Sequence, residues 1–427
     1  MRRRQPLIHS LVQRLYITWE TFNGNDLFTY ASAGAYSFLL SALPMVLMVL
    51  VILIRFLHTS PQVIQELLAE NTLIANSFDA SSFIHSVISI KQIGLFEIVL
   101  ALSVFWMARR FFMSIQQGMK IIYRKRGTKK AIKENLIIIA GEAILVILVV
   151  VMVIIITAGN ALFHTMLPQS FLTPFVVTLF KNLFRFVPFG IIPIFLFLVY
   201  YFAPSARPPA RNSWWASLAC TASFAIVQTA FSAAINVSRY NLVYGILSNV
   251  IVILLEVYLF FFLFLFFAQY QYVTQFYDSF LIAQLYLLPP YDDVRISRQI
   301  ERTMFIEPLH FYGTYAIAKH TGEFIFCQGE DSDEIYYVWQ GTIRLTLPNQ
   351  IMDVGRGKMF GEFSSIVGGT RTATAVALSD VLLLKIPGRV FQETLEVDGA
   401  LSRKTLQMIT DYVRKSNNLP LFSDDEL

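Results

Sequence analysis

The segment from Phe360 to Ala375 holds the residues whose types and spacing are best suited to bind an anion. It reads FGEFSSIVGGTRTATA. A glycine that precedes a short helical turn exposes backbone N–H groups, which favour a negative charge. Arg371, nine residues after Glu362, can return a guanidinium to the same place and hold a phosphate through two hydrogen bonds. Because Glu362 can accept a hydrogen bond from a ribose hydroxyl, the segment predicts a ligand that carries both groups close together, as a cyclic nucleotide does.

The elements that must position this segment are short strands that begin at about residue 306. Alternating apolar runs at 323–326, 334–339, 342–347 and 381–386 are separated by turn glycines. This pattern is typical of a small β-barrel or jelly roll. A helical stretch follows at 399–416, and we expect the acidic end of the chain, residues 417–427, to be disordered.

The composition of the whole chain indicates a membrane protein. Of its 427 residues, 55% are hydrophobic and 15% are charged, whereas soluble domains have about 25% charged residues. Residues 1–289 carry a net charge of +10 and residues 290–427 one of −5, which together give the +5 of the chain. Two physically different parts therefore join near residues 289–290. This division excludes a one-piece soluble enzyme, and the two cysteines exclude a disulfide framework.

Six apolar runs are long enough to cross a bilayer, which requires roughly 20 residues in a helix. They cover about residues 36–57, 93–115, 136–158, 175–202, 213–236 and 246–270. Ahead of them, residues 10–30 mix apolar and polar side chains, which favours a helix that lies in the membrane interface. The predicted fold class is an α-helical polytopic bundle of six transmembrane helices, followed by a small cytoplasmic β-jelly roll with flanking helices.

The loops between these runs predict the orientation. The loop at 120–133 carries seven Lys or Arg residues and no Asp or Glu, whereas the loops 58–90 and 159–174 carry no Lys or Arg. Because positive residues stay on the cytoplasmic side, we expect both termini to be cytoplasmic. A nucleic-acid patch at 120–133 is the weaker reading, since anionic lipid next to an apolar run explains the charge.

Charged residues inside the apolar runs are expensive in a membrane and need a partner or a polar cavity. Glu142, Lys181, Arg185 and Glu256 predict a polar pathway through the bundle, and structural pairing or snorkelling is the alternative. No nucleophile–base pair and no set of metal ligands accompanies them. We therefore predict no catalytic residue, no metal site and no enzyme activity.

The membrane part resembles the YihY/BrkB family of bacterial inner-membrane proteins. The resemblance lies in AYSFLLSALP at 35–44, in 110–123, in 204–215 and in YNLVYGIL at 240–247, and it covers roughly residues 10–275. Where the family usually closes its sixth span with a glutamate, this chain has Gln269. The family was formerly labelled ribonuclease BN, which the scattered histidines here do not support. The resemblance implies an envelope protein of the inner membrane that moves lipid or a small solute.

The C-terminal part resembles cyclic nucleotide-binding domains, whose phosphate-binding cassette has the same nine-residue Glu-to-Arg interval. TGEFI at 321–325, QGE at 328–330 and IYYV at 335–338 follow in the family's order. The resemblance implies that Gly361, Glu362, Arg371 and Thr372 bind cyclic AMP or cyclic GMP as a regulatory ligand, with no other cofactor. Domains of this kind that serve only as docking folds usually lose the Glu or the Arg, and this chain keeps both.

These observations predict five regions and one leading function. The regions are an interfacial N-terminal helix (1–30), a six-helix membrane domain (31–275), a linker (276–305), a cyclic nucleotide-binding domain (306–416) and a tail (417–427). We expect a lipid or small-solute transporter of the inner membrane that is regulated by cyclic nucleotide, with membrane lipids and the nucleotide as partners and no nucleic acid. A homo-oligomer is left open. The alternatives are a non-transporting envelope scaffold and a cyclic nucleotide-gated channel, which the lack of a selectivity filter and of a voltage-sensing Arg series disfavours.

Overall fold

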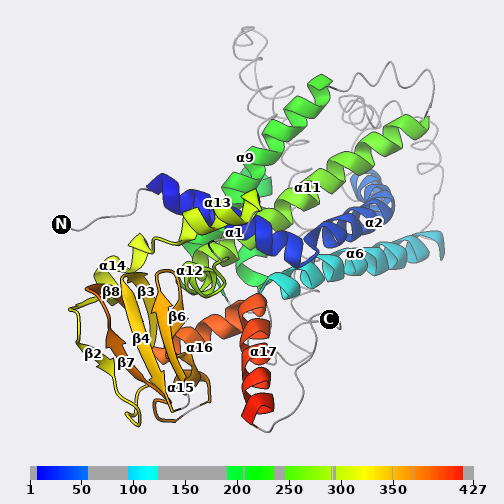
Figure 1. Ribbon diagram of the computed structural model, residues 1–427. Helices are drawn as coiled ribbons and strands as arrows, with labels where there is room; N and C mark the ends of the chain where they lie inside the picture. The colour runs from blue at the N-terminus through cyan, green and yellow to red at the C-terminus, as the bar shows by residue number, and fades with distance from the viewer. Residues whose placement is uncertain are drawn as a thin grey trace. The chain divides into compact units, whose positions relative to one another are not determined.

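The computed structural model describes residues 7–55, 95–123, 190–204, 207–234, 246–289, 291, 295–348, 350–367 and 369–416. The chain divides into two compact units (Figure 1). One consists of Thr18–Gln275, which we call the helical unit, and the other of Met1–Ile17 together with Phe276–Leu427, which we call the sheet unit. The long helix α1 (Leu7–Gly24) begins in the sheet unit and ends in the helical unit.

The helical unit is organised around one long helix. Its described helices are α2 (Leu27–Arg55), α6 (Leu95–Ile122), α9 (Ala210–Ala234) and α11 (Ile246–Gln275), with a further described helix at Gly190–Phe202. Helix α11 contacts α2, α6 and α9, and Figure 1 shows it running between α9 and α2. A Cβ atom on Gly34 of α2 would lie 2.7 Å from the ring of Phe261, so a glycine at this place lets the two helices approach closely.

Polar side chains also join these helices. Gln269 donates a hydrogen bond of 2.9 Å to the Thr21 hydroxyl, and Gln271 one of 2.7 Å to the Ser213 hydroxyl. The hydroxyl of Tyr200 donates to the carbonyl oxygen of Phe264 over 2.9 Å. Gln269, which stands where the related family usually has a glutamate, thus acts as a donor, a role that an ionised carboxylate cannot take.

Four of the six predicted spans coincide with described helices, namely α2, α6, α9 and α11, and Gly190–Phe202 covers the end of the fourth predicted span. Among the described residues, one helix, Ile251–Gln275, is long and apolar enough to cross a membrane by length and composition. The third predicted span lies outside the described residues, as do Glu142, Lys181 and Arg185 of the predicted polar pathway. Glu256 lies on α11 and is half-buried.

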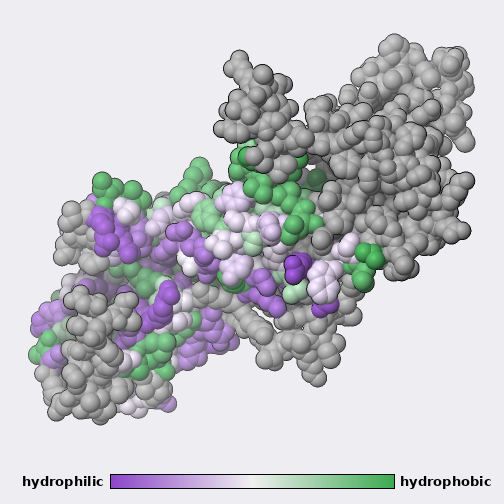
Figure 2. Space-filling view, turned by 90° about the vertical axis from the view of Figure 1, so that its right-hand side faces the viewer, coloured by the Kyte–Doolittle hydropathy of each residue, from purple (hydrophilic) through white to green (hydrophobic). Residues whose placement is uncertain are grey.

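The described helices of this unit expose large hydrophobic side chains. They include Trp214, Trp215 and Ile226 of α9 and Ile251, Leu254 and Leu255 of α11. On the face that Figure 2 shows, hydrophobic residues (green) and hydrophilic residues (purple) both reach the surface. Exposed apolar surface on packed helices is what a lipid environment accommodates.

The sheet unit begins with helices that the sequence predicted as a linker. These are α12 (Tyr277–Tyr286) and α13 (Ile296–Phe305), followed by the short turns η2 (Leu309–Phe311) and α14 (Tyr312–Tyr315). Helix α12 has buried residues on every side, which explains why its sequence shows little helical periodicity.

Two antiparallel four-stranded sheets form the body of this unit. The strands are β1 (Ala316–Lys319), β2 (Phe324–Phe326), β3 (Ile335–Gln340), β4 (Thr342–Leu347), β5 (Gln350–Gly355), β6 (Met359–Phe360), β7 (Thr374–Ala377) and β8 (Val381–Ile386). Their orders are β1-β8-β3-β6 and β2-β7-β4-β5. Inward-facing residues of both sheets, among them Val338, Ile343 and Leu383, form the core.

Three helices complete the unit: α15 (Glu362–Val367), α16 (Gly388–Val397) and α17 (Gly399–Ser416). Helix α15 lies directly after β6, and α16 packs on both α15 and α12. The predicted strands 342–347 and 381–386 and the predicted helix 399–416 agree with β4, β8 and α17.

Candidate functional site

The site is built where β6 ends and α15 begins, within residues 360–375, which we call the cassette. Gly361 connects the two elements with a φ of +81°, in the left-handed region that favours glycine. A Cβ atom at this position would also lie 2.9 Å from Nη1 of Arg371. The local turn and the close approach of the guanidinium therefore both require glycine.

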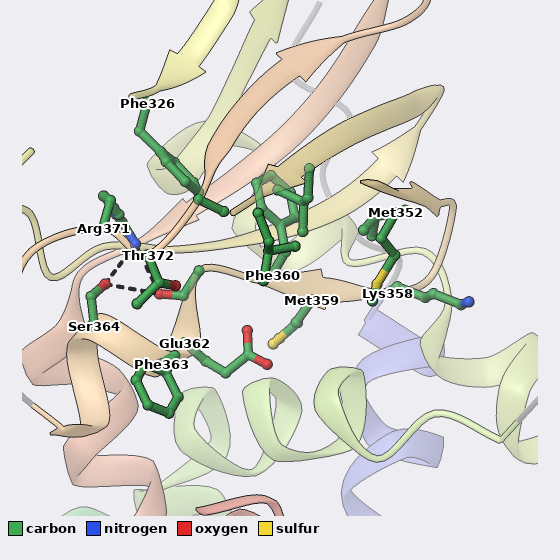
Figure 3. A pocket seen from close by; sticks show the side chains of 15 residues that line it. Phe326, Met352, Lys358, Met359, Phe360, Glu362, Phe363, Ser364, Arg371 and Thr372 are labelled. Carbon is green, nitrogen blue, oxygen red and sulfur yellow. Dashed lines mark hydrogen bonds between the residues drawn. The ribbon is translucent and has the colours of Figure 1, made fainter. Parts of the chain in front are cut away.

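The backbone of Arg371 is fixed by the turn that follows β2. Its N–H donates to the carbonyl oxygen of Glu330 over 2.9 Å, and its own carbonyl oxygen accepts from the N–H of Gly329 over 2.9 Å. These bonds fix the backbone of the arginine, and its side chain reaches Ser364 of α15 (Figure 3).

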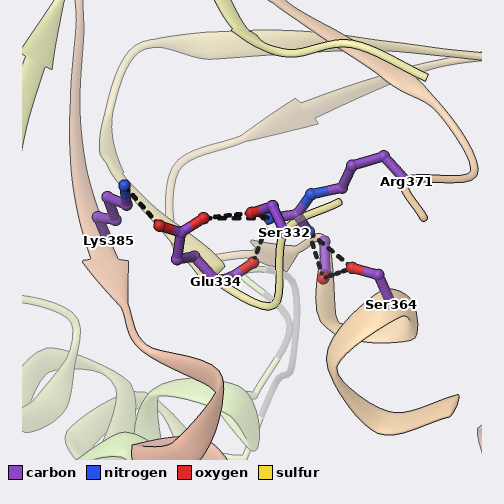
Figure 4. A network of polar contacts seen from close by, with 6 residues as sticks. Ser332, Glu334, Ser364, Arg371 and Lys385 are labelled. Atoms are coloured by element: carbon purple, nitrogen blue, oxygen red, sulfur yellow. Dashed lines mark hydrogen bonds and ion pairs between the residues drawn. The ribbon is translucent and has the colours of Figure 1, made fainter. Parts of the chain in front are cut away.

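The guanidinium of Arg371 is buried, with the residue 2% exposed, and it donates four hydrogen bonds. Nη1 donates to the carbonyl oxygen of Gly361 over 2.8 Å and to the Ser364 hydroxyl over 2.9 Å. Nη2 donates to the Ser332 hydroxyl and to the carbonyl oxygen of Glu334, each over 2.7 Å (Figure 4). The Nε of Arg371 is buried without a hydrogen-bond partner. One donor of the guanidinium thus has no acceptor among the described residues.

The carboxylate of Glu334 lies next to this arginine. Glu334 lies 3.8 Å from Nη2 of Arg371 and 2.6 Å from the ammonium of Lys385, and the Ser332 hydroxyl also donates to it (Figure 4). Burial by itself would raise the pKa of Glu334, but the hydrogen bonds and charges of its partners outweigh burial and lower it below 4.5. Glu334 is therefore ionised at neutral pH and orients the guanidinium from the side away from the cassette.

Phe326 lies against the guanidinium, with 4.2 Å between Cζ of Arg371 and the centre of the ring. Burial lowers the pKa of Arg371, whereas Tyr336 and the nearby carboxylates raise it. Since the ordinary pKa of arginine exceeds 12, the group stays charged at neutral pH.

A cavity of about 270 Å³ opens beside the cassette (Figure 3). Its volume is near the lower end of the range for small-molecule sites, about 300–1,000 Å³. Glu362, Ser364, Arg371 and Thr372 make one part of the lining polar. Residues of the second sheet and its neighbours make another part apolar, including Leu345, Leu347, Met352 and Val354. This division suits a ligand with an anionic group at one end and a flat apolar ring at the other.

The four residues predicted to bind the ligand all line this cavity, but they have different surroundings. Thr372 is exposed, and Glu362 is half-buried with its carboxylate pointing away from Arg371 (Figure 3). No ion pair joins Glu362 to Arg371, both of which are described, so the arginine is not held by the cassette glutamate. The sequence reasoning missed Ser332, Glu334 and Lys385, because they lie in other loops and strands and follow no local spacing.

Glu362 instead lies near Lys404 of α17 and Tyr286 of α12. Burial raises the pKa of Glu362, and the charge of Lys404 opposes the rise. Burial, with the nearby charge of Glu362, raises the pKa of Tyr286 to about 12. Lys404 donates a hydrogen bond of 3.1 Å to the carbonyl oxygen of Tyr286, and the ring of Tyr286 lies 5.7 Å from that of Phe391 in α16. The cassette, the C-terminal helices and α12 therefore meet at one cluster.

Comparison with known proteins agrees with this architecture. A model described as a cyclic nucleotide-binding domain matches residues 318–398, so the sheet unit carries a domain of that class. The helical part is matched by a model described as virulence factor BrkB over residues 18–279. This match takes in more than half of the chain, and the protein belongs to the BrkB family of membrane proteins.

Individual relatives match only a part of the chain. Lysophospholipase nte1 of Aspergillus terreus is 28% identical over 111 residues, 25% of this chain and 7% of that protein. A cyclic nucleotide-gated potassium channel of Rhizobium etli is 32% identical over 71 residues, 17% of this chain and 20% of that protein. The crystal structure of the Thermus thermophilus catabolite activator protein is 26% identical, with a TM-score of 0.22, over 24% of this chain and 51% of that one. The chain thus spans less than a tenth of the length of the first of these relatives.

Proposed function

We propose that this protein is an inner-membrane transporter of an envelope lipid or small solute, regulated by a cyclic nucleotide that binds beside the cassette. The observation that carries the regulatory part is the buried guanidinium of Arg371. Four of its N–H groups are held by the protein, the fifth, on Nε, has no hydrogen-bond partner among the described residues, and Arg371 is one of the residues that line the cavity. A buried, oriented arginine with a spare donor suits a phosphate, which accepts charge-assisted hydrogen bonds.

We propose that Glu362 and Thr372 bind the sugar and phosphate edges of the nucleotide, and that the base lies along the apolar lining. Both side chains border the same cavity as Arg371. The carboxylate of Glu362 then has two competing environments, the ribose hydroxyl and Lys404. Nucleotide binding would in this way change the contacts among Glu362, Lys404 and Tyr286, and so change how α17 packs on α12.

The proposed route to the membrane follows the chain. Helix α12 begins at Tyr277, two residues after α11 ends at Gln275. A change in the contact between α17 and α12 would shift the conformational equilibrium of the membrane helices only if the nucleotide binds one of the two conformations more tightly than the other. The membrane part of the proposal has six spans and cytoplasmic termini, supported by the basic loop at 120–133 and by α2, α6, α9 and α11. We propose no enzyme activity.

The test uses the full chain in proteoliposomes, because the sheet unit includes Met1–Ile17 and α12 as well as the β-sandwich. Lipid and solute flux is measured with cyclic AMP, with cyclic GMP and without nucleotide, for the native protein and Arg371→Lys. A nucleotide-dependent flux that Arg371→Lys abolishes supports the proposal. If both nucleotides bind but neither changes the flux, regulation by cyclic nucleotide is contradicted. If no flux of lipid or solute is measured at all, the non-transporting scaffold is favoured.

A cyclic nucleotide-gated channel is the second candidate, because a relative of 32% identity carries that name. That match spans 71 residues, 17% of this chain, so it bears on a part of the protein only. Single-channel current recordings in planar bilayers distinguish the two. Discrete nucleotide-dependent conductance steps would favour the channel over the transporter.

A further inference from the structure

One face of α1 is held firmly by the sheet unit. Nε2 of Gln13 donates a hydrogen bond of 2.8 Å to the carbonyl oxygen of Met304 in α13, and Oε1 accepts one of 2.6 Å from the Tyr277 hydroxyl. The guanidinium of Arg14 lies 4.4 Å from the centre of the Tyr277 ring. These contacts fix the rotation of α1 about its axis, and with it the direction of the opposite face.

That opposite face is apolar and exposed. Ile8, Leu11, Val12 and Leu15, which we call the α1 stripe, follow the spacing i, i+3, i+4, i+7 that places side chains on one side of a helix. They are between 39% and 78% exposed, and Trp19, four residues further on, is 52% exposed. A continuous apolar row of this kind on the surface marks an interaction site.

The chain itself indicates what the stripe contacts. Helix α1 ends at Gly24 and α2, which contains the first predicted span, begins at Leu27, so α1 lies within a few residues of a membrane-entering helix. Residues 1–17 contain Arg2, Arg3, Arg4 and Arg14 and no acidic residue. A run of basic residues shortly before an apolar helical face in the sequence, here residues 2–4, is the pattern of a helix that lies among anionic headgroups.

The aromatic residue at the end of the stripe fits the same location. Tryptophan prefers the boundary between headgroups and hydrocarbon, where its apolar ring and its N–H are both accommodated. We propose that the α1 stripe binds the headgroup region of the membrane, with a preference for anionic lipid, and thereby ties the sheet unit to the bilayer surface. The proposal does not depend on nucleotide binding.

The test places nitroxide labels on the full chain in lipid nanodiscs. In a background of Cys220→Ala and Cys327→Ser, labels are attached to Ile8→Cys, Leu11→Cys, Val12→Cys and Leu15→Cys. Ile351→Cys in β5, where the native residue is 67% exposed on the sheet unit, is the control. Collision rates with oxygen, which concentrates in lipid, are compared with those of a water-soluble nickel chelate.

We expect the stripe labels to collide more with oxygen than with nickel, and the label at 351 to show the reverse. In nanodiscs of phosphatidylglycerol the labels on the α1 stripe should lie deeper in the lipid, with a higher ratio of oxygen to nickel collisions, than in nanodiscs of phosphatidylcholine. The triple variant Arg2→Gln, Arg3→Gln, Arg4→Gln should remove that difference. Higher nickel than oxygen collision at the stripe would overturn the proposal, because the face would then be in water. Low rates with both reagents would overturn it as well, because a protein partner or a second copy would then cover the face.

A second measurement needs no cysteine replacement. Brominated lipids quench tryptophan fluorescence only at short range. The difference in fluorescence between the native protein and Trp19→Phe isolates the contribution of Trp19. The proposal requires that lipids brominated near the headgroup quench this Trp19 fluorescence. If the difference is insensitive to brominated lipid, α1 does not lie at the surface.

Discussion

The ammonium of Lys404 donates a hydrogen bond of 3.1 Å to the carbonyl oxygen of Tyr286 and lies 5.0 Å from the centre of its ring. Lys404 belongs to α17, the last helix among the described residues, and Tyr286 is the last residue of α12. Since Glu362 of the cassette lies near both, this one contact links the candidate ligand site to the helix that follows α11.

Replacing Lys404 should separate binding from response. Lys404→Met keeps the aliphatic chain but removes the hydrogen bond to Tyr286, and Lys404 does not line the cavity. We expect nucleotide affinity within about threefold of the native value, and a coupling to flux weakened by about 1 kcal/mol, roughly fivefold. Both are measured on the same proteoliposomes. Arg403→Met, at an exposed neighbouring position, is the matched control and should change neither; a native response in Lys404→Met would exclude this contact from the route.

Gly361 tests the geometry of the cassette. Gly361→Ala meets two obstacles, a φ of +81° and the Nη1 of Arg371 at 2.9 Å, so we expect a loss of about 2–3 kcal/mol in unfolding free energy and loss of nucleotide binding. Gly322→Ala is the control, because its φ is +86° but no atom lies within 4 Å of the added Cβ. It should cost only about 1–2 kcal/mol. Equal losses in thermal unfolding for the two variants would show that Arg371 does not lie against Gly361.

The pH dependence of stability should report on Glu334. The pKa of its carboxyl is lowered in the folded protein, so its stabilising contribution is present above the unfolded value near 4.5 and is lost as the pH falls through the folded value. The unfolding temperature of the native protein should therefore decrease below about pH 4.5. Lys385→Met removes the partner at 2.6 Å, brings the folded-state pKa of Glu334 back toward the unfolded value and should therefore make this decrease smaller, and Glu334→Gln should remove the part of it that Glu334 causes. Superimposable pH profiles of the three proteins would contradict the ion-pair network.

Nucleotide affinity should depend on pH through Glu362. Burial raises the pKa of this carboxyl above 4.5, so protonation begins at a higher pH than for an ordinary glutamate. Because an ionised carboxylate accepts a hydroxyl hydrogen bond more strongly than a protonated one, affinity should fall as the solution is acidified toward that pKa. Glu362→Gln should bind more weakly at neutral pH and lose this acid dependence. An unchanged acid dependence in the variant would assign it to another group.

The polar contacts at the end of α11 should matter for the helical unit. Gln271→Glu removes the donor to Ser213 and places a carboxylate at a position that is 1% exposed, so we expect at least about 1–3 kcal/mol of destabilisation. Gln117→Glu, on the exposed face of α6, is the matched control and should have little effect. Thermal unfolding in detergent compares the two. Equal unfolding temperatures would mean that Gln271 is not buried against α9.

Local spacing was enough to predict much of the sheet unit. The strands at 342–347 and 381–386 alternate clearly, the helix at 399–416 is amphipathic, and the Glu362-to-Arg371 interval lies within one segment. What the sequence could not predict depends on contacts between distant residues. Ser332 and Glu334 reach Arg371 from 39 and 37 residues away, and α12 is packed on so many sides that its helical period is hidden. Of the predicted polar pathway, Glu256 alone is described, so its convergence with Glu142, Lys181 and Arg185 stays a prediction.

The most direct test of the account is a calorimetric titration of the full chain in nanodiscs with cyclic AMP and cyclic GMP, for the native protein and for Arg371→Lys. Lysine keeps the positive charge but cannot span the acceptors that the guanidinium bridges. We expect saturable binding of at least one nucleotide, weakened in the variant by about 1.5–3 kcal/mol, roughly ten- to a hundredfold. Absence of binding to the native protein, or equal affinity in Arg371→Lys, would contradict a phosphate site at this arginine.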